Sequence, residues 1–189
     1  MAKWVIDPDH SVAAFSVRHL MIADVHGQFN MIGGAVSFDP DDQTAFTLDA
    51  VIDAAGIYTG IAKRDEHLRS PDFFDTATFP AIIFHSSVFE PSGSNKGKLT
   101  GQLTIRDITR GIILDAVISD PVKSPEEIGG ETTIGISART SVNREDFGMT
   151  WNVPLAGGGV MVGRNIAIIL DICLLYTSPS PRDRTRSRM

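Results

Sequence analysis

The chain of 189 residues contains a single cysteine, no long uninterrupted apolar run and no excess of basic residues. One cysteine excludes an intrachain disulfide framework and any metal site built from thiolates alone. The formal net charge is −6 at pH 7. We therefore expect no nucleic-acid partner, because neutralising phosphates requires clustered Lys and Arg.

Membrane-spanning and targeting segments are also not visible. The most apolar stretch, residues 166–176, is interrupted by Asp171 and is shorter than the roughly 20 residues that cross a bilayer. The first residues lack an apolar core followed by a small-residue cleavage site. We expect a protein that does not span a membrane and is cytoplasmic as written, or periplasmic if the N-terminus is incomplete.

The last seventeen residues differ in composition from the rest of the chain. Residues 173–189 hold four of the seventeen basic residues, and they show no apolar periodicity after Tyr176. Such a composition is typical of a disordered tail. The string also resembles the translation of a sequencing-library adapter. We therefore expect one domain over residues 1–172, followed by a non-native disordered tail over residues 173–189.

The dominant periodicity of residues 1–172 is two. In residues 44–53, apolar Phe46, Leu48, Ala50 and Ile52 alternate with other side chains, as in a strand with one apolar face. About eight β-rich runs are separated by turn residues, over 11–19, 27–38, 44–53, 79–89, 98–106, 111–118, 132–143 and 165–172. The pattern predicts an all-β sandwich or barrel.

One segment breaks this pattern. Residues 61–69 read as a short helix, with Thr59 as its expected cap and Ser70-Pro71 at its end. We expect Ile61 and Leu68 to pack this helix across the barrel.

Several strands are apolar on both faces, as in residues 82–84, 112–114 and 168–170. A strand with one face in water does not have this composition. The interior of a closed barrel of about eight strands holds either packed side chains or one small ligand. Periodicity alone leaves a filled core and a cavity as alternatives.

No catalytic or metal motif stands out. The five histidines have no paired metal-ligand spacing, so hydrogen-bonding roles are favoured over a metal site. Ser11, His67 and Asp65 supply the residue types of a nucleophilic triad, but no G-x-S-x-G turn carries the serine.

Residues 64–75 combine charged and aromatic side chains more densely than any other segment. Asp65 and Arg69 have the spacing of a solvated helix pair, worth a few tenths of a kcal/mol. Alternatively, the segment forms a rim that holds a polar head group, with Phe73 and Phe74 beside the pocket entrance. Spacing does not separate these two interpretations.

A series of motifs extends over nearly the whole domain in order. They are Trp4-x-Ile6-Asp7-x-x-His10-Ser11, Phe15-x-Val17-x-His19, Val25-x-Gly27-x-Phe29, Ile57-x-Thr59, Arg64-Asp65-x-His67-Leu68-Arg69-x-x-Asp72-Phe73-Phe74-Asp75, Pro80-x-x-x-Phe84-x-Ser86, Gly101-x-Leu103-Thr104-Ile105-Arg106-x-Ile108-Thr109 and Arg144-x-x-Phe147-Gly148-Met149. This series resembles the YceI-like family, also called polyisoprenoid-binding proteins. The segment around the short helix is the most specific part of the resemblance.

The resemblance implies an eight-stranded antiparallel, lipocalin-like barrel that encloses an elongated apolar pocket. It further implies that the ligand is a long-chain isoprenoid or similar lipid. Members of the family have no established catalytic step and are often dimeric. We therefore expect a non-catalytic lipid carrier, storage or sequestering protein that forms a homodimer. It would need no cofactor, and its ligand would be an isoprenoid such as a quinone or a prenyl phosphate. The alternatives are a hydrolase or isomerase acting on a lipid in the barrel, and a structural stress-response dimer with a filled core.

On this interpretation, apolar side chains line or cap the pocket and cations form a polar rim. The apolar candidates are Phe15, Val17, Phe29, Phe46, Phe84, Ile105 and Phe147, with Phe73 and Phe74 at the entrance. The rim candidates are Arg18, His19, Arg64 and His67, because cations neutralise a phosphate or hydrogen-bond a quinone oxygen. The same four groups would equally serve to brace the helix on the barrel.

Overall fold

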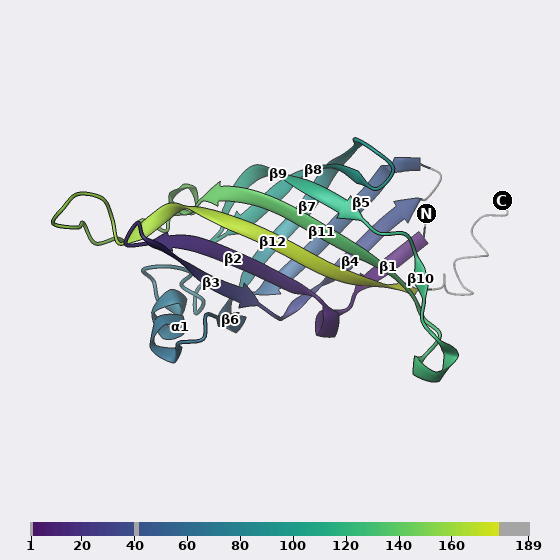
Figure 1. Ribbon diagram of the computed structural model, residues 1–189, viewed down its shortest axis with the longest axis horizontal. Helices are drawn as coiled ribbons and strands as arrows, with labels where there is room; N and C mark the ends of the chain where they lie inside the picture. Colours follow the sequence, from purple (N-terminus) through teal and green to yellow (C-terminus); the bar gives the residue numbers. More distant parts are fainter. Residues whose placement is uncertain (1, 40–41, 178–189) are drawn as a thin grey trace.

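The alternation of apolar and polar residues produces a sheet that closes on itself, in a computed structural model that describes residues 2–39 and 42–177 (Figure 1). The strands are β1 Ala2–Ile6, β2 Val12–His19, β3 Ala23–Phe29, β4 Ile32–Asp39, β5 Asp42–Asp53, β6 Ile57–Tyr58, β7 Ala81–Pro91, β8 Lys96–Ile105, β9 Ile108–Ile118, β10 Val122–Lys123, β11 Thr132–Asn143 and β12 Val162–Thr177. One helix, α1 Ala62–Arg69, follows β6. Short 3-10 turns are η1 Pro8–His10, η2 Ala54–Gly56, η3 Glu126–Ile128 and η4 Arg144–Phe147.

Eight of the strands in the described part of the chain form a closed antiparallel ring. Their order is β11-β9-β8-β7-β5-β4-β1-β12, and β12 pairs back onto β11. The other edge of β12 pairs with β2 and then, further along, with β1. The strands β2, β3 and β6 therefore continue the wall beside α1. The predicted all-β, eight-stranded antiparallel barrel with one short helix is confirmed.

One predicted strand is in fact two. The run expected over residues 27–38 breaks at Asn30 and Met31, both of which are exposed. Before the break, β3 pairs with β2 and β6, and after it β4 pairs with β1 and β5. The two halves pair with different strands, and the apolar pattern of a single segment does not indicate which strands it pairs with.

The last strand extends beyond the domain boundary predicted at residue 172. It continues to Thr177, with Leu174 opposite Ile6 and Tyr176 opposite Trp4. Leu174 is buried because it continues the inward-facing alternation of Ile172. The strand predicted over residues 165–172 therefore ends five residues too early, since composition rather than alternation sets its predicted end. Residues 178–189, the rest of the expected tail, lie outside the described residues.

The helix α1 is tied to the barrel by side chains rather than capped by Thr59. Its N-cap is Ile61, which makes no side-chain cap hydrogen bond, so Thr59 is not the cap. Ile61 is also 53% exposed, so it does not pack the helix on the barrel as predicted. Instead, the Thr59 amide donates to the Asp65 carboxylate at 2.9 Å. Arg69 donates to two backbone carbonyls of residues 55 and 57, at 2.8 and 3.0 Å. Among the described residues, no helix is long and apolar enough to cross a membrane.

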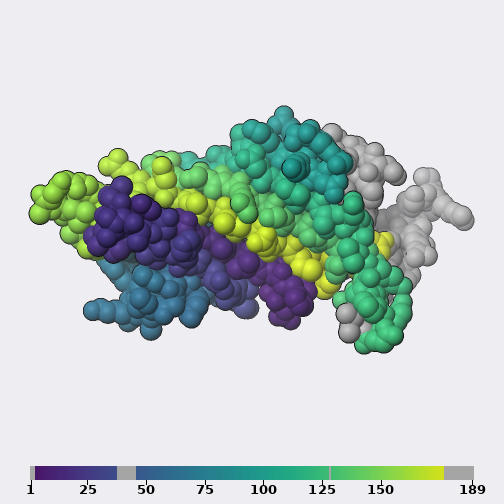
Figure 2. All heavy atoms as spheres, viewed as in Figure 1, coloured from purple at the N-terminus to yellow at the C-terminus, as the bar shows by residue number. Residues whose placement is uncertain are grey.

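The end of the barrel away from α1 is filled by large side chains. Trp4 packs edge-on against Tyr176 with ring centroids 5.2 Å apart, and Phe46 packs against Phe89 at 5.3 Å. We call this the closed end. Figure 2 shows the opposite end, where α1 and the segment that precedes β12 lie near the turn between β2 and β3.

Candidate functional site

An apolar cavity of about 150 Å³ occupies the barrel between its middle and the end beside α1. Its wall is formed by inward-facing side chains of β1 to β5, β7 to β9, β11 and β12. Leu68 of α1, with Phe73 and Phe74 just after it, covers one end. Thr140 and Arg144 are the only polar members of the described lining.

Burial differs between the two ends of the barrel. Phe15, Val17 and Ile166 face the interior but remain only partly buried, because they border empty space. At the closed end, Trp4 and Leu174 are 4% and 1% exposed. The interior is therefore filled at one end and hollow at the other. A cavity of about 150 Å³ with this kind of lining accommodates a benzene-sized group.

The aromatic cluster of His67, Phe73 and Trp151 covers the hollow end. The His67 ring lies 4.8 Å from that of Trp151 and 5.1 Å from that of Phe73, centroid to centroid. His67 Nε2 also contacts the Asp72 carboxylate at 2.8 Å. The cluster thus joins the helix segment to the loop between η4 and β12. We call α1, residues 70–74 and Trp151 the cover.

Most of the predicted apolar residues line the cavity. Those in the lining are Phe15, Val17, Phe29, Phe73, Phe74, Phe84 and Ile105. Phe46 and Phe147 are buried but lie outside it. Phe46 belongs to the closed end, and Phe147 is part of η4 and the packed core. The structure thus brings seven of the nine apolar candidates together around one cavity.

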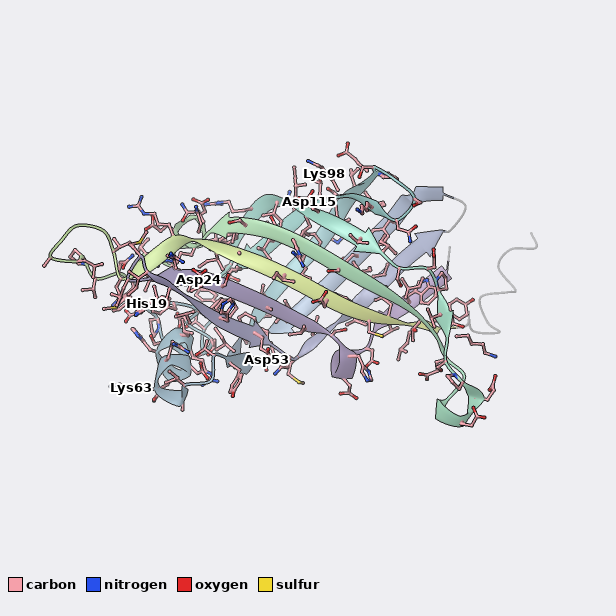
Figure 3. The ribbon with its side chains drawn as sticks, viewed as in Figure 1. His19, Asp24, Asp53, Lys63, Lys98 and Asp115 are labelled. Atoms are coloured by element: carbon pink, nitrogen blue, oxygen red, sulfur yellow. The ribbon has the colours of Figure 1, made fainter. Side chains whose placement is uncertain are left out.

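The four predicted rim cations lie near the hollow end but not in the described lining. Arg18 contacts Asp24 across β2 and β3 at 3.3 Å. Figure 3 shows His19 and Asp24 in the same region, where β2 turns into β3. Arg64 donates to the hydroxyl and the carbonyl of Thr59, both at 2.7 Å, so it braces the start of α1. His67 takes part in the cover.

Arg144 is a cavity residue that the sequence analysis did not select. Its side chain is 2% exposed. Nε donates to the Gly163 carbonyl at 2.9 Å and Nη2 to the Val162 carbonyl at 3.4 Å, while Nη1 contacts the Met149 carbonyl. Burial lowers the pKa of this guanidinium from its ordinary value, but an arginine stays charged at neutral pH.

A sequence signal for Arg144 does exist. Along β11 the inward positions are Ile134, Ile136, Ala138, Thr140 and Val142. Continuing this alternation by one step places residue 144 on the inward face. Arg144 therefore follows a series of inward positions that are all apolar except Thr140. This alternation predicts that the arginine faces the interior of the barrel.

The residues of the possible nucleophilic triad are not assembled. The Ser11 hydroxyl accepts a hydrogen bond from the Cys173 amide at 2.9 Å. Asp65 is bound to Thr59, and His67 contacts Asp72. Within residues 2–39 and 42–177, no group of three or more His, Cys, Asp or Glu could hold a metal ion.

Comparison with known proteins identifies close relatives along the whole barrel. A family model described as YceI-like domain matches residues 4–174. UPF0312 protein SA2479 of Staphylococcus aureus (strain N315) is 33% identical over 166 residues, covering 88% of this chain and 93% of the relative. UPF0312 protein SAB2563 of S. aureus (strain bovine RF122 / ET3-1) is 34% identical over the same coverage.

Solved structures share the fold. The Campylobacter jejuni YceI protein is 30% identical, with a TM-score of 0.69 over 85% of this chain and 90% of that one. Burkholderia cenocepacia BcnA has a TM-score of 0.75 at 20% identity, over 89% and 98% of the two chains. A polyisoprenoid binding domain from Saccharophagus degradans has a TM-score of 0.68 at 13% identity, over 94% and 100%. The last two likenesses concern the fold alone. From the family match and the identity to its relatives, the chain belongs to the YceI-like family.

Proposed function

We propose that this protein binds a long-chain isoprenoid or a similar amphiphilic lipid in the barrel cavity, as a carrier, storage or sequestering protein that catalyses no reaction. The observation that carries the proposal is the cavity itself, whose lining is apolar except at Thr140 and Arg144. Transfer of a hydrocarbon chain into such a lining contributes about 0.8 kcal/mol per buried CH₂. The costs of ordering the ligand reduce the net affinity well below that sum. The structural likeness to a polyisoprenoid binding domain agrees with this choice of ligand.

The size of the cavity indicates how a long chain would enter. The volume of about 150 Å³ suits one small group and not a whole polyprenyl chain. The wall strands are fixed by continuous pairing, whereas Leu68, Phe73 and Phe74 belong to the cover. We propose that the chain enters by displacing the cover and enlarges the cavity at that end.

The proposal of a non-catalytic role draws on the chemistry of the lining. In the described residues, the polar lining groups are one hydroxyl and one guanidinium. A guanidinium that stays protonated does not act as a general base, and proton transfer in catalysis needs such a group within hydrogen-bond reach. The cavity therefore supplies no acid–base pair for hydrolysis or isomerisation, which supports binding over turnover.

We further propose that the protein forms a homodimer through the outer face of β5, β7 and β9. Val51 and Ile83 are cross-strand partners that are 49% and 44% exposed. Val88 and Ile113, 49% and 53% exposed, flank Thr100 on β8. Light scattering should give twice the mass of 20.4 kDa, and Ile83→Lys should give the single mass. A single mass for the unaltered protein at all concentrations would contradict dimerisation.

Filling the cavity tests the proposed binding site. Ala50 faces the interior and lines the cavity, so Ala50→Trp should occupy the space needed by the ligand. Ala167 faces outward on β12, so Ala167→Trp is a matched control. After removal of any bound lipid, uptake of geranylgeraniol should be lost in the first variant and retained in the second. Equal uptake by both variants would place the lipid elsewhere.

A further inference from the structure

We infer that Arg144 binds an anionic oxygen head group, a phosphate or a carboxylate, inside the barrel, so that the lipid lies with its head near the cover and its tail toward the closed end. This inference rests on the proposed function and narrows it to acidic amphiphiles, in preference to neutral quinones. It also assigns the head group to a buried residue of η4 and not to the exposed cations around the hollow end.

The charge of Arg144 is not balanced by its direct contacts in the described part of the chain. A buried guanidinium is costly unless it is both hydrogen-bonded and paired with an opposite charge. Its protein partners are three backbone carbonyls, which supply dipoles but no net negative charge. A guanidinium has five N–H donors, so two remain for a further acceptor.

Among the described residues, no neighbouring carboxylate contacts Arg144; Glu145 acts on it through space, and Arg164 opposes that effect. Glu145, the adjacent acid on η4, contacts Arg164 of β12 at 3.2 Å. Asp146 is exposed on the outer side of the same turn. No salt bridge joins Arg144 to a carboxylate in the part of the chain that the structure describes. An anionic ligand would therefore supply the missing charge, in the bidentate geometry that suits phosphate and carboxylate.

The polarity of the lining also changes along the cavity. Arg144 follows the last inward position of β11, at the end where β12 begins with Val162. Thr140 is the next polar group of the lining inward along β11. Deeper in the cavity the lining is apolar as far as Ile6 and Ile172. Such a gradient orients an amphiphile with its head at Arg144.

Two ligands with the same chain test the inference. Geranylgeranyl monophosphate should bind the delipidated wild-type protein about 10–100 times more tightly than geranylgeraniol, as expected for hydrogen bonds to a charged group. Arg144→Gln should remove most of this preference, measured as the ratio of the two affinities within the variant. Arg139 is exposed on β11, the strand that precedes η4, so Arg139→Gln should keep the full preference. Equal affinities in the wild type, or a preference that survives Arg144→Gln, would overturn the inference.

A second measurement does not depend on folding of the variant. In the wild-type complex, the phosphorus NMR signal of the bound phosphate should resist broadening by a neutral gadolinium chelate, because the head lies inside the barrel. A signal broadened like that of an exposed phosphate would place the head on the surface and contradict the role of Arg144. Binding of the alcohol without a preference for the phosphate would refute only this inference. Binding of neither ligand would refute the proposed function as well.

Discussion

Gly27 of β3 leaves the space that the ring of Phe15 occupies on β2. The two residues are cross-strand partners. A β-carbon at position 27 would lie 2.3 Å from Phe15 Cζ and 2.8 Å from Thr59 Cγ2, closer than atoms pack in proteins. The glycine is therefore required by the position of a cavity-lining ring and not by a special backbone conformation.

Gly27→Ala should destabilise the protein by about 1–3 kcal/mol, because the ring must move within a packed wall. Gly33 is the matched control, since nothing lies within 4 Å of a β-carbon added there. Gly33→Ala should change stability by less than about 0.5 kcal/mol. Urea unfolding of the two variants measures both effects. Equal stability of the two would show that Phe15 does not depend on position 27.

His10 and Asp7 form a titratable pair at η1. His10 Nδ1 lies 2.7 Å from Asp7 Oδ2, and this hydrogen bond raises the pKa of His10 and lowers the pKa of Asp7. The contribution of His10 is fully present below its ordinary pKa of about 6.5 and is lost as the pH rises through the raised value. That of Asp7 is present above its ordinary pKa and is lost as the pH falls through the lowered one.

An NMR titration of the His10 ring should show this coupling. In Asp7→Asn the midpoint of His10 should fall toward about 6.5, because the charged partner is gone. Asp49→Asn is a control, since Asp49 contacts His85 instead. A His10 midpoint that is the same with and without the Asp7 charge would contradict the interaction.

At the scale of elements, α1 depends on Asp65 for its attachment. The carboxylate is 5% exposed and accepts hydrogen bonds from both the amide and the hydroxyl of Thr59. Because α1 belongs to the cover, this attachment also sets how firmly the hollow end is closed.

Asp65→Ala should cost about 1–3 kcal/mol, because it leaves the Thr59 amide without its acceptor. Hydrogen exchange of the Thr59 amide should become faster, and bound lipid should leave faster. Glu66→Ala alters an exposed neighbour and should change neither rate. Unchanged exchange at Thr59 in the Asp65 variant would argue against the attachment.

The elements also show where prediction from sequence succeeds. The predicted helix over residues 61–69 agrees with α1 to within one residue, because its period differs from that of the strands and Ser70-Pro71 ends it. Its attachment was not foreseen, because Thr59 satisfies a buried carboxylate in place of the first helical turn. The break at Asn30 and Met31 was missed for a similar reason, since it is set by which strands pair with β3 and β4.

At the scale of the whole molecule, the barrel and the apolar character of its interior follow from alternation and from strands that are apolar on both faces. The division of the interior into a hollow end and a closed end does not follow from these patterns. It depends on register, which brings Phe46 against Phe89 and Trp4 against Tyr176. The roles of Arg18 and Arg64 do not follow from the sequence either, because spacing does not show which acceptors their side chains contact.

Native mass spectrometry of the purified protein, before and after extraction with an organic solvent, tests the central claim most directly. We expect an excess mass that corresponds to one amphiphilic lipid per barrel, that disappears on extraction and that returns when geranylgeranyl monophosphate is added. A mass equal to that of the bare chain before extraction, together with no uptake of the added lipid, would contradict it.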